Sequence, residues 1–372
     1  MKNKKQTVVL GLSGGVDSAV SCYLLLKQGF NVIPVFMQNW DTVINNDIKG
    51  HNKKLPDGCE SNVDYLAAKK VATFFNLKLH KVEFIKEYWD DVFKYFIAQY
   101  KKSLTPNPDV LCNKYIKFEA FRKYALKNFK ADYLATGHYA AIKQTKNGSF
   151  LLMPKDLTKD QTYFLSDLNQ EQLKDVIFPL ANLTKVEVRK IAKRIKLPNW
   201  DRKDSMGICF IGKRQFQEFL ANYIPNQPGN IVDIKTNKVV GKHIGTMYYT
   251  LGQNKELHLS GQPTKYFVCD KDIKKKIIYV CAQADRQKYL SSTQCELTSF
   301  NFINPSSSKS LTYLKVRFRH LQKLIKVKSL KKTNGKWILS YDKTLSVTPG
   351  QYAVLYKNKI CLGCGEIRKI IK

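Results

Sequence analysis

The segment Thr7-Val8-Val9-Leu10-Gly11-Leu12-Ser13-Gly14-Gly15-Val16-Asp17-Ser18 decides the fold of this chain. Its first six residues are apolar and rich in β-branched side chains, a pattern typical of a buried parallel strand. Residues 19–27 are good helix formers with an apolar face, and Gly29 is placed to end that helix. A strand, a glycine-containing turn and a helix start together predict an anion site, because backbone N–H groups and the helix dipole favour negative charge there.

The glycine-serine turn from Ser13 to Ser18 is expected to hold the phosphates of a nucleotide. Gly14 and Gly15 allow backbone N–H groups to approach a phosphate, while the two serines add hydroxyl donors. The turn lacks the Gly-Lys-Ser/Thr of a Walker A loop, so the usual P-loop kinase or GTPase is excluded. It instead resembles the PP-loop of ATP pyrophosphatases, which cut ATP between its α and β phosphates to adenylate a substrate oxygen. Asp17 stands in register with that loop.

Strand and helix patterns alternate through the first half of the chain. Strands are predicted over residues 7–12, 30–37, 77–84 and 131–136, and helices over 19–27, 62–75, 86–101 and 113–128. Such alternation implies βαβ units and a parallel sheet, whose ligand belongs at the carboxyl ends of the strands. The segments that share this edge are 13–18, 37–40 and 137–139. Residues 40–60 are polar and lack periodicity, so they predict a loop.

The pattern changes in the second half of the chain. Helical patterns over 184–195 and 213–223 enclose a loop, and short alternating stretches with turns begin near residue 228. These stretches predict two small β-barrels that are divided near residues 285–294. The expected fold class is therefore α/β. It comprises a parallel-sheet PP-loop domain over 1–212, a central small β-rich domain over 213–288 and a C-terminal β-barrel domain over 289–372.

Composition indicates a globular protein with a polyanionic partner. The chain has 372 residues, of which 44% are hydrophobic, and no apolar run approaches the roughly 20 residues that span a bilayer. The basic start lacks a leader-like apolar region, and nine scattered cysteines fit reduced cytosolic thiols, so we expect a cytoplasmic protein without membrane contact. The net charge of +33 favours a phosphate backbone as the partner, although a general lysine bias of the composition is the alternative.

Two of the cysteines stand in settings that suggest reactivity. Cys112 follows two stiffening prolines at the predicted start of a helix with Lys114 nearby, which would favour its thiolate. Cys209 lies in a loop between Gly207 and Gly212, where a thiol could reach a cleft. Without further information, each of these cysteines is either a reactive thiol or, as is more common, a small buried hydrophobic residue.

Taken in order, the motifs of the whole chain resemble one family. Behind Ser-Gly-Gly-Val-Asp-Ser come Asn-Pro-Asp-Val-Leu-Cys-Asn-Lys (107–114), Ala-Thr-Gly-His-Tyr (135–139), Lys-Asp-Gln-Thr-Tyr-Phe-Leu (159–165), Gly-Ile-Cys-Phe-Ile-Gly (207–212), Tyr-Thr-Leu-Gly-Gln (249–253) and Thr-Pro-Gly-Gln (348–351). This series closely resembles the bacterial tRNA-specific 2-thiouridylases, also called tRNA-uridine 2-sulfurtransferases. The match covers essentially the entire chain.

The resemblance implies a reaction and its catalytic residues. The family adenylates O2 of the wobble uridine, position 34 of tRNA, with ATP and then transfers sulfur from a cysteine persulfide. Cys209 would carry the persulfide, and Cys112 would attack it or form a disulfide with Cys209 as sulfur is released. Asp109 falls where the family places a candidate acid or base. Because the two sulfurs must meet, we expect the Cys209 loop to reorder when substrates bind, with Gly207 and Gly212 as hinges.

The resemblance also implies binding residues and partners. The expected ATP contacts are Gly11, Leu12, Ser13, Gly14, Gly15, Val16, Asp17, Ser18, Met37 and Gly137. The expected tRNA contacts are Asn107, Pro108, Asp109, His138, Lys159, Asp160, Gln161, Arg317, Phe318 and Gln351, of which 107–109 would line the pocket of a flipped uridine. Mg²⁺ would accompany ATP, and no resident metal site is expected. The partners would be tRNAs with Lys, Glu or Gln anticodons and a persulfide donor, either a cysteine desulfurase or a sulfur-carrier protein.

Several features depart from this pattern or allow other functions. Asn254 and Glu256 replace an Arg and a Gly common in the family, and Phe318 replaces a Tyr while keeping a ring able to stack. The pair Cys361 and Cys364 lacks the second ligand pair that zinc needs, so it is interpreted as incidental. An amidating PP-loop synthetase and a basic RNA-binding protein with a degenerate nucleotide site are the alternatives. The first would not need the two cysteines, and the second would not release AMP and pyrophosphate.

Overall fold

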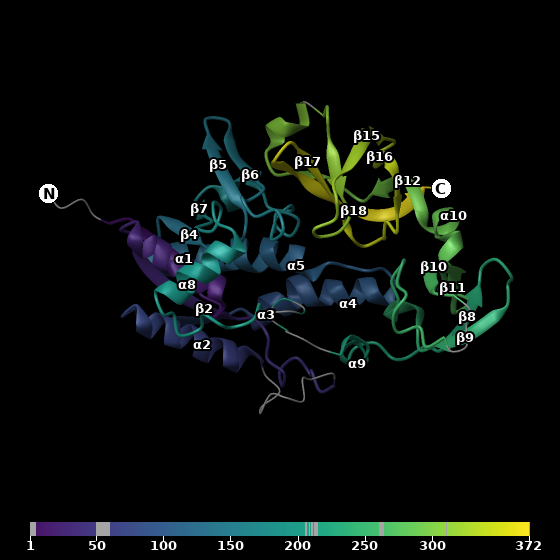
Figure 1. The fold of residues 1–372 in the computed structure, drawn as a ribbon, viewed down its shortest axis with the longest axis horizontal. Coiled ribbons are helices and arrows are strands. Elements are labelled where there is room, and N and C mark those ends of the chain that lie inside the picture. Colours follow the sequence, from purple (N-terminus) through teal and green to yellow (C-terminus); the bar gives the residue numbers. More distant parts are fainter. Residues whose placement is uncertain are drawn as a thin grey trace.

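The computed structural model describes residues 5–49, 60–204, 207, 209, 211, 215–259, 264–309 and 311–371. A five-stranded parallel sheet with the order β3-β2-β1-β4-β7 forms the centre of the N-terminal part (Figure 1). Its strands are β1 (Thr7–Gly11), β2 (Asn31–Gln38), β3 (His80–Glu83), β4 (Tyr133–Ala135) and β7 (Val176–Ile177). The predicted parallel sheet is confirmed, and β7 is a strand that the sequence pattern did not indicate.

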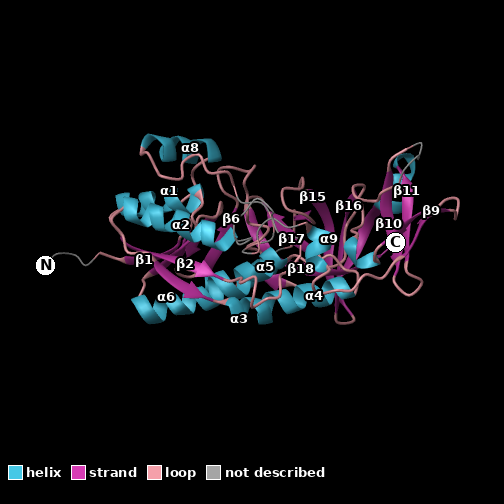
Figure 2. Ribbon diagram, turned by 90° about the horizontal axis from the view of Figure 1, so that it is seen from below, coloured by secondary structure: helices cyan, strands magenta, loops and turns pink. Residues whose placement is uncertain are grey.

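Helices cover both faces of this sheet, which accounts for its continuous apolar strands (Figure 2). In β1, Val8 and Leu10 pack on one side and Val9 on the other. The first side carries α1 (Val16–Lys27), α2 (Glu60–Phe74) and α8 (Lys185–Arg194). The second side carries α3 (Ile85–Tyr88), α4 (Lys94–Lys101), α5 (Pro108–Leu111) and α6 (Phe121–Phe129).

Two π-helical segments join helices on the second side into longer stretches. Trp89–Phe93 connects α3 to α4, and the nine residues Cys112–Ala120 connect α5 to α6. The second stretch begins five residues before the predicted start at 113. The side chain of Asn107 caps it by accepting from the Asp109 backbone N–H at 3.2 Å, and Pro108 suits the first helical position.

The central part is a smaller β-sheet unit. Its four strands have the order β10-β11-β8-β9, with the β8–β11 pair parallel and the other two pairs antiparallel. They are β8 (Gly229–Asp233), β9 (Val239–His243), β10 (Tyr266–Asp272) and β11 (Ile277–Ala282). Short helices flank the unit: α9 (Phe216–Leu220) precedes it and α10 (Arg286–Leu290) leads to the C-terminal part.

The C-terminal strands close into a barrel. The sheet order runs β12-β16-β15-β14-β17-β18, and β12 also pairs with β18. The strands are β12 (Ser291–Leu297), β13 (Asn301–Phe302), β14 (Lys315–Arg317), β15 (Ile325–Thr333), β16 (Lys336–Leu345), β17 (Tyr352–Lys357) and β18 (Ile360–Ile371). This confirms the predicted C-terminal barrel.

A hairpin from the N-terminal part extends the same barrel sheet. It consists of β5 (Ala141–Thr145) and β6 (Gly148–Leu152), and it is followed by the short helix α7 (Gln170–Leu173). Leu152 pairs with Ile360 and Leu151 with Cys361 of β18, in antiparallel register. The hairpin stands beside the barrel in Figure 1. Hydrogen-bonded sheet therefore crosses between the segments predicted as the first and the third domain.

The loop predicted over residues 40–60 is described in part. Its first portion, Asp41–Lys49, consists of turns, and residues 50–59 lie outside the described residues. Within the described ranges, no helix has both the length and the apolar character needed to cross a membrane.

Candidate active site

The phosphate-binding turn lies between β1 and α1, at the carboxyl end of the central strand. Gly14 has φ +79°, and a Cβ added there would lie 2.4 Å from the carbonyl oxygen of Asp64. Only glycine fits such a position. The Ser18 hydroxyl donates to the Gly15 carbonyl at 3.0 Å and lies 3.2 Å from the Ser13 hydroxyl. The turn is thus held in shape by its own serines at the N-terminus of a helix, as an anion site requires.

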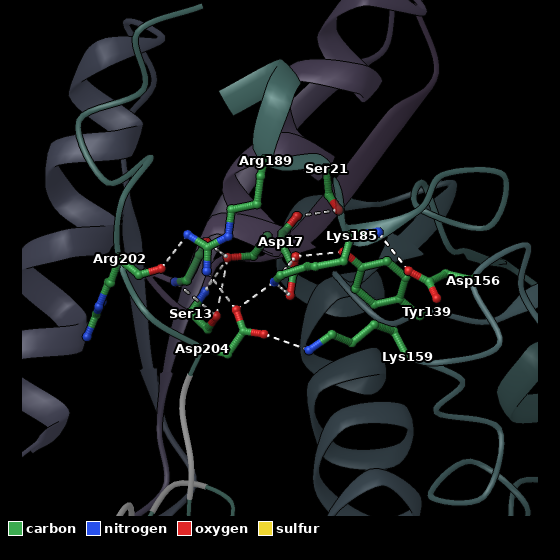
Figure 3. Close-up of polar contacts among 12 residues, drawn as sticks. Ser13, Asp17, Ser21, Tyr139, Asp156, Lys159, Lys185, Arg189, Arg202 and Asp204 are labelled. Carbon is green, nitrogen blue, oxygen red and sulfur yellow. Dashed lines mark hydrogen bonds and ion pairs between the residues drawn. The ribbon is translucent and has the colours of Figure 1, made fainter. Parts of the chain in front are cut away.

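An ion-pair network surrounds Asp17 at this turn (Figure 3). The Asp17 carboxylate accepts from the Lys185 ammonium at 2.7 and 2.8 Å and from the Tyr139 hydroxyl at 2.9 Å. Lys185 also pairs with Asp204 at 2.7 Å, and Asp204 pairs in turn with Lys159 at 2.9 Å. Partial burial acts to raise the pKa of Asp204, but the bonds and charges of the two lysines outweigh it and lower the pKa to about 2.

A second set of contacts holds the far side of the turn. The carbonyl of Gly14 accepts from Asn199 at 2.8 Å and from the Arg202 guanidinium at 3.0 Å, and Arg202 also pairs with Asp64. Sequence reasoning missed these groups together with Lys185. Lys185, Asn199 and Arg202 follow the last strand of the sheet and carry no local motif, and the helical pattern over 184–195 was the only signal near them. Asp64 lies earlier in the chain, in α2.

The structure brings together the two cysteines that the sequence singled out. The sulfurs of Cys112 and Cys209 lie 3.6 Å apart, although 97 positions separate them in the chain. Both are free thiols, with Cys112 fully buried and Cys209 half-buried. The backbone N–H of Cys209 donates to the Asp109 carboxylate at 3.2 Å, and its carbonyl accepts from the Tyr88 hydroxyl at 3.0 Å. The three predicted catalytic residues therefore form one cluster.

The approach of the sulfurs does not require the predicted loop movement. They already lie 3.6 Å apart, so only a small shift separates them from bonding distance. Gly207, one expected hinge, has φ +127°. Gly212, the other, lies outside the described residues.

The electrostatics of the pair differ from the sequence prediction. Burial, together with hydrogen bonding to Cys209, raises the pKa of Cys112 well above its ordinary value. The hydrogen bond from Cys112 and the positive charge of Lys117 lower the pKa of Cys209 against the effect of burial. The expected activated thiolate at Cys112 is therefore wrong, because this residue lies inside a continuous helix. Lys114 turns away to pair with Asp167 at 2.8 Å.

The end of β4 joins the phosphate turn to the cysteine cluster. A Cβ on Gly137 would lie 2.8 Å from the Ser18 backbone nitrogen, so the turn packs directly against this glycine. The next residue, His138, is buried with its ring 6.0 Å from that of Phe118 in the π-helix that begins at Cys112. Burial and the charge of Lys117 hold the pKa of His138 well below its usual value, so the ring is neutral.

The remaining predicted ATP contacts line the same sheet edge. Gly11 ends β1, and a Cβ there would lie 3.2 Å from the terminal methyl of Met37 on β2. Leu12 and Val16 are buried on either side of the turn and pack in the apolar layer beneath α1. These residues shape the turn, while the polar contacts come from its serines and from Asp17.

The predicted tRNA contacts near the domain boundary divide into two groups. The first lies close to the cysteine cluster: Gln351 donates to the Thr105 carbonyl at 2.8 Å and accepts from Asn107 at 3.4 Å, and Pro108 begins α5. Near the phosphate turn, Gln161 accepts from the Tyr139 backbone N–H at 2.8 Å.

The second group is buried. Asp160 and Arg317 form an ion pair, with side chains 0% and 9% exposed, and the Arg317 guanidinium lies 5.2 Å from the ring of Tyr356. Phe318 is 1% exposed, and its ring packs 4.7 Å from that of Tyr341 in the barrel core. The expected stacking of the Phe318 ring on a base does not fit this position. The ion pair of Asp160 and Arg317 connects the N-terminal part to the barrel, whereas Phe318 packs within the barrel core.

Cys361 and Cys364 both lie buried on β18. The Cys361 thiol donates to the Thr162 carbonyl at 3.8 Å. Across the described residues, no group of three or more His, Cys, Asp or Glu side chains is arranged to hold a metal ion.

Three segments of the chain match models of known protein families, and these matches define the class of protein. Residues 6–213 match the model described as the tRNA methyl transferase HUP domain, residues 217–282 its PRC-barrel domain, and residues 292–367 an aminomethyltransferase beta-barrel domain. Together with the turn at Ser13–Ser18, these matches show that the chain consists of a PP-loop domain followed by two β-rich domains.

The chain belongs to the family of tRNA-specific 2-thiouridylases. It is 52% identical over 367 residues to the tRNA-specific 2-thiouridylase MnmA of Ureaplasma parvum serovar 3, covering 98% of this chain and 95% of the relative. It is 54% identical over 377 residues to that of Mycoplasma capricolum subsp. capricolum, covering 99% and 100%. A solved 4-thiouridine synthetase–RNA complex with bound ATP is similar at 19% identity and a TM-score of 0.35, over 56% of this chain and 46% of that one. That likeness is too slight to bear on function.

Proposed function

We propose that this protein thiolates the 2-position of the wobble uridine, position 34 of tRNA, at the expense of ATP. The observation that supports this most directly is the pair of sulfurs of Cys112 and Cys209, 3.6 Å apart, in a cluster joined by β4 to a phosphate-binding turn. Adenylation alone needs the turn but no thiols. A methyl transfer, which the description of the matching family model mentions, would need no thiol pair either.

The first step is activation of the base. O2 of the uridine attacks the α-phosphorus of ATP, and pyrophosphate leaves. O2, a poor leaving group by itself, is then bonded to AMP and can leave with it in the next step. The uridine must leave the base stack to reach these atoms. Asn107, Pro108 and Asp109, at the start of the helix that bears Cys112, line the proposed pocket. Asp109 is the proposed acid or base, and burial raises the pKa of its carboxyl group, which favours the protonated form that an acid needs.

The second step is sulfur transfer. The terminal sulfur of a Cys209 persulfide attacks C2 of the adenylated uridine, and AMP leaves with the former O2. Cys112 then loses its thiol proton as it attacks the Cys209 sulfur, forming a Cys112–Cys209 disulfide and releasing 2-thiouridine. In the alternative order, Cys112 attacks the persulfide first, which yields the same disulfide and a hydrosulfide ion as the nucleophile. In both orders an external reductant restores the thiols.

The residues around the phosphate turn fit Mg²⁺ as a companion of ATP. Asp17 and Asp204 supply the carboxylate oxygens that Mg²⁺ prefers, and the ion usually takes only one or two of these beside the phosphates. Bound there, it would neutralise phosphate charge during adenylation. Lys185, which contacts both carboxylates, would remain as a fixed positive charge beside the phosphates.

The proposed partners follow from the same chemistry. The net charge of +33 suits tRNA, and the family suggests the tRNAs with Lys, Glu or Gln anticodons. The sulfur donor is a cysteine desulfurase or a sulfur-carrier protein that presents a persulfide to Cys209. The cytoplasm is the compartment that holds both tRNA and reduced thiols.

Reconstitution with tRNA, ATP, Mg²⁺, a persulfide donor and a reductant tests the proposal. Mass spectrometry of the tRNA nucleosides should detect 2-thiouridine with the wild-type protein and none with Cys209→Ser or Cys112→Ser. In Cys112→Ser, Cys209 should still become a persulfide. Cys361→Ser is the control, because its hydroxyl can keep the bond to the Thr162 carbonyl.

Four outcomes would count against this function or against its assigned residues. Thiolated tRNA made by Cys209→Ser, or a persulfide found on Cys112 alone, would overturn the assignment of the two cysteines. Full activity of both serine variants on an amidation substrate would favour the synthetase alternative. A lack of tRNA-stimulated AMP and pyrophosphate release by the wild-type protein would favour the RNA-binding alternative.

A further inference from the structure

The π-helix that begins at Cys112 brings a second residue of that helix to the cysteine pair. In an α-helix, residues five positions apart point about 140° away from one another. In a π-helix each turn holds one more residue, because the hydrogen bonds run from i to i+5, so such residues share a face. The segment Cys112–Ala120 is π-helical over nine residues, far more than the single turn usually seen. Lys117 therefore lies on the face of Cys112.

The electrostatics of the cluster agree with this placement. The positive charge of Lys117 acts to lower the pKa of both Cys209 and Cys112, and the charges of these two cysteines and of Asp109 act to raise the pKa of Lys117. Among the described residues, the groups that interact electrostatically with Cys209 are Cys112 and Lys117 from the π-helix, Asp109 from α5 and Tyr88 from α3. Lys117 is the cation among these four. Lys114, two positions after Cys112, is instead paired with Asp167.

We propose that Lys117 is a further catalytic residue, whose ammonium stabilises the anion on the Cys209 sulfur and so makes Cys209, rather than Cys112, the acceptor of sulfur. This inference rests on the proposed function, since it explains which of the two cysteines accepts sulfur in that reaction. The π-helix has a defined role in it: an α-helix over the same residues would turn Lys117 away from the sulfurs.

The step that Lys117 assists is the loading of Cys209. The Cys209 thiolate attacks the terminal sulfur of the donor persulfide, a new sulfur–sulfur bond forms, and the donor bond breaks with its electron pair on the donor thiolate. The proton of the donor persulfide remains on the transferred sulfur, so charge and atoms balance. Cys112 stays a neutral thiol meanwhile, because it is buried and donates its hydrogen to Cys209. The two cysteines therefore do not compete for the donor.

Alkylation of individual cysteines as a function of pH tests the proposal without tRNA or ATP. Iodoacetamide reacts with the thiolate, and peptide mass spectrometry reports Cys209 and Cys112 separately in the complete protein. Lys117→Met keeps an unbranched side chain that is one atom shorter and removes the charge. It should move the alkylation midpoint of Cys209 upward by about one to three pH units and slow its reaction at pH 7 at least about tenfold. Lys117→Arg should keep most of the wild-type rate, and Lys114→Met on the same helix should leave the profile unchanged.

Two results would overturn the role of Lys117. One is a folded Lys117→Met protein whose Cys209 profile matches that of the wild type. The other needs no variant: in the wild-type protein, Cys112 reacts at lower pH than Cys209. Failure of the proposed function is recognised separately, as the absence of 2-thiouridine in the reconstituted wild-type reaction whatever the alkylation profile.

Discussion

Asp160→Asn should destabilise the protein rather than remove a surface contact with tRNA. The carboxylate of Asp160 is fully buried and pairs with Arg317 on β14 of the barrel. Its other oxygen accepts from the backbone N–H and hydroxyl of Thr162 at 3.0 and 2.7 Å. An asparagine can keep the bonds to Thr162, so the change mainly leaves the guanidinium of Arg317 buried without its partner charge.

The size of the effect follows from this burial. Removing one member of a buried ion pair costs about 3–5 kcal/mol, whereas an exposed pair contributes about 0–1 kcal/mol. Lys94→Met, which breaks the exposed i,i+4 pair with Asp90, is therefore a matched control expected to leave the free energy of unfolding nearly unchanged. The double variant Asp160→Asn/Arg317→Met should regain most of the lost stability, because it leaves no unpaired buried charge.

Urea unfolding and tRNA affinity should be measured on the same preparations. The expected result is a large drop in the urea midpoint of Asp160→Asn, with tRNA affinity retained while the protein is folded. A change in unfolding free energy below about 1 kcal/mol, together with a clear loss of tRNA affinity, would refute this reasoning. It would instead support the direct contact with tRNA that the sequence suggested.

Three further predictions concern ATP and tRNA. Asp17→Ala should abolish the release of AMP and pyrophosphate yet leave tRNA affinity nearly intact, since the turn and the barrel are separate surfaces; equal loss of both would contradict that separation. Gly14→Ala should cost about 1–3 kcal/mol in the strained backbone and lose the thermal stabilisation that ATP confers, because its Cβ would lie 2.4 Å from the Asp64 carbonyl oxygen; an unchanged ATP effect would show that the turn tolerates a side chain. The logarithm of tRNA affinity should fall steeply and linearly with the logarithm of salt concentration between about 50 and 200 mM, and a flat dependence would mean that the positive charge is only composition.

The parts of the fold that were predicted from the sequence are those with a strong local signal. β1, the phosphate turn and α1 carry a continuous apolar run, two glycines and a helix pattern, and all three appear where expected. β7 has only two residues, too short for any periodicity. The hairpin β5–β6 has weak alternation of its own and is stabilised by pairing with β18, which lies more than two hundred positions further along the chain.

The candidate site likewise contains residues that the sequence predicted and residues that it did not. Cys112, Cys209 and Asp109 were found because they stand in motifs that resemble a family. Lys117 was missed because the sequence interpretation considered only Lys114, which is nearer to Cys112 in the chain, and nothing local in the sequence indicated that the hydrogen bonds shift to i+5. Lys185 was missed because tertiary folding alone, without a motif, brings it to Asp17.

The pairing of β6 with β18 also bears on the order in which the protein can fold during synthesis. N-terminal domains generally fold first as a chain leaves the ribosome. Here the edge of β6 has no partner until Ile360 and Cys361 have been made, and β18 must also meet β12, β13 and β17. Until then the nascent chain presents an open strand edge, a feature that promotes association between chains. Release of the last dozen residues therefore completes the first domain as well as the last, and a chain truncated before β18 should aggregate even though every residue of the nucleotide-binding turn is present.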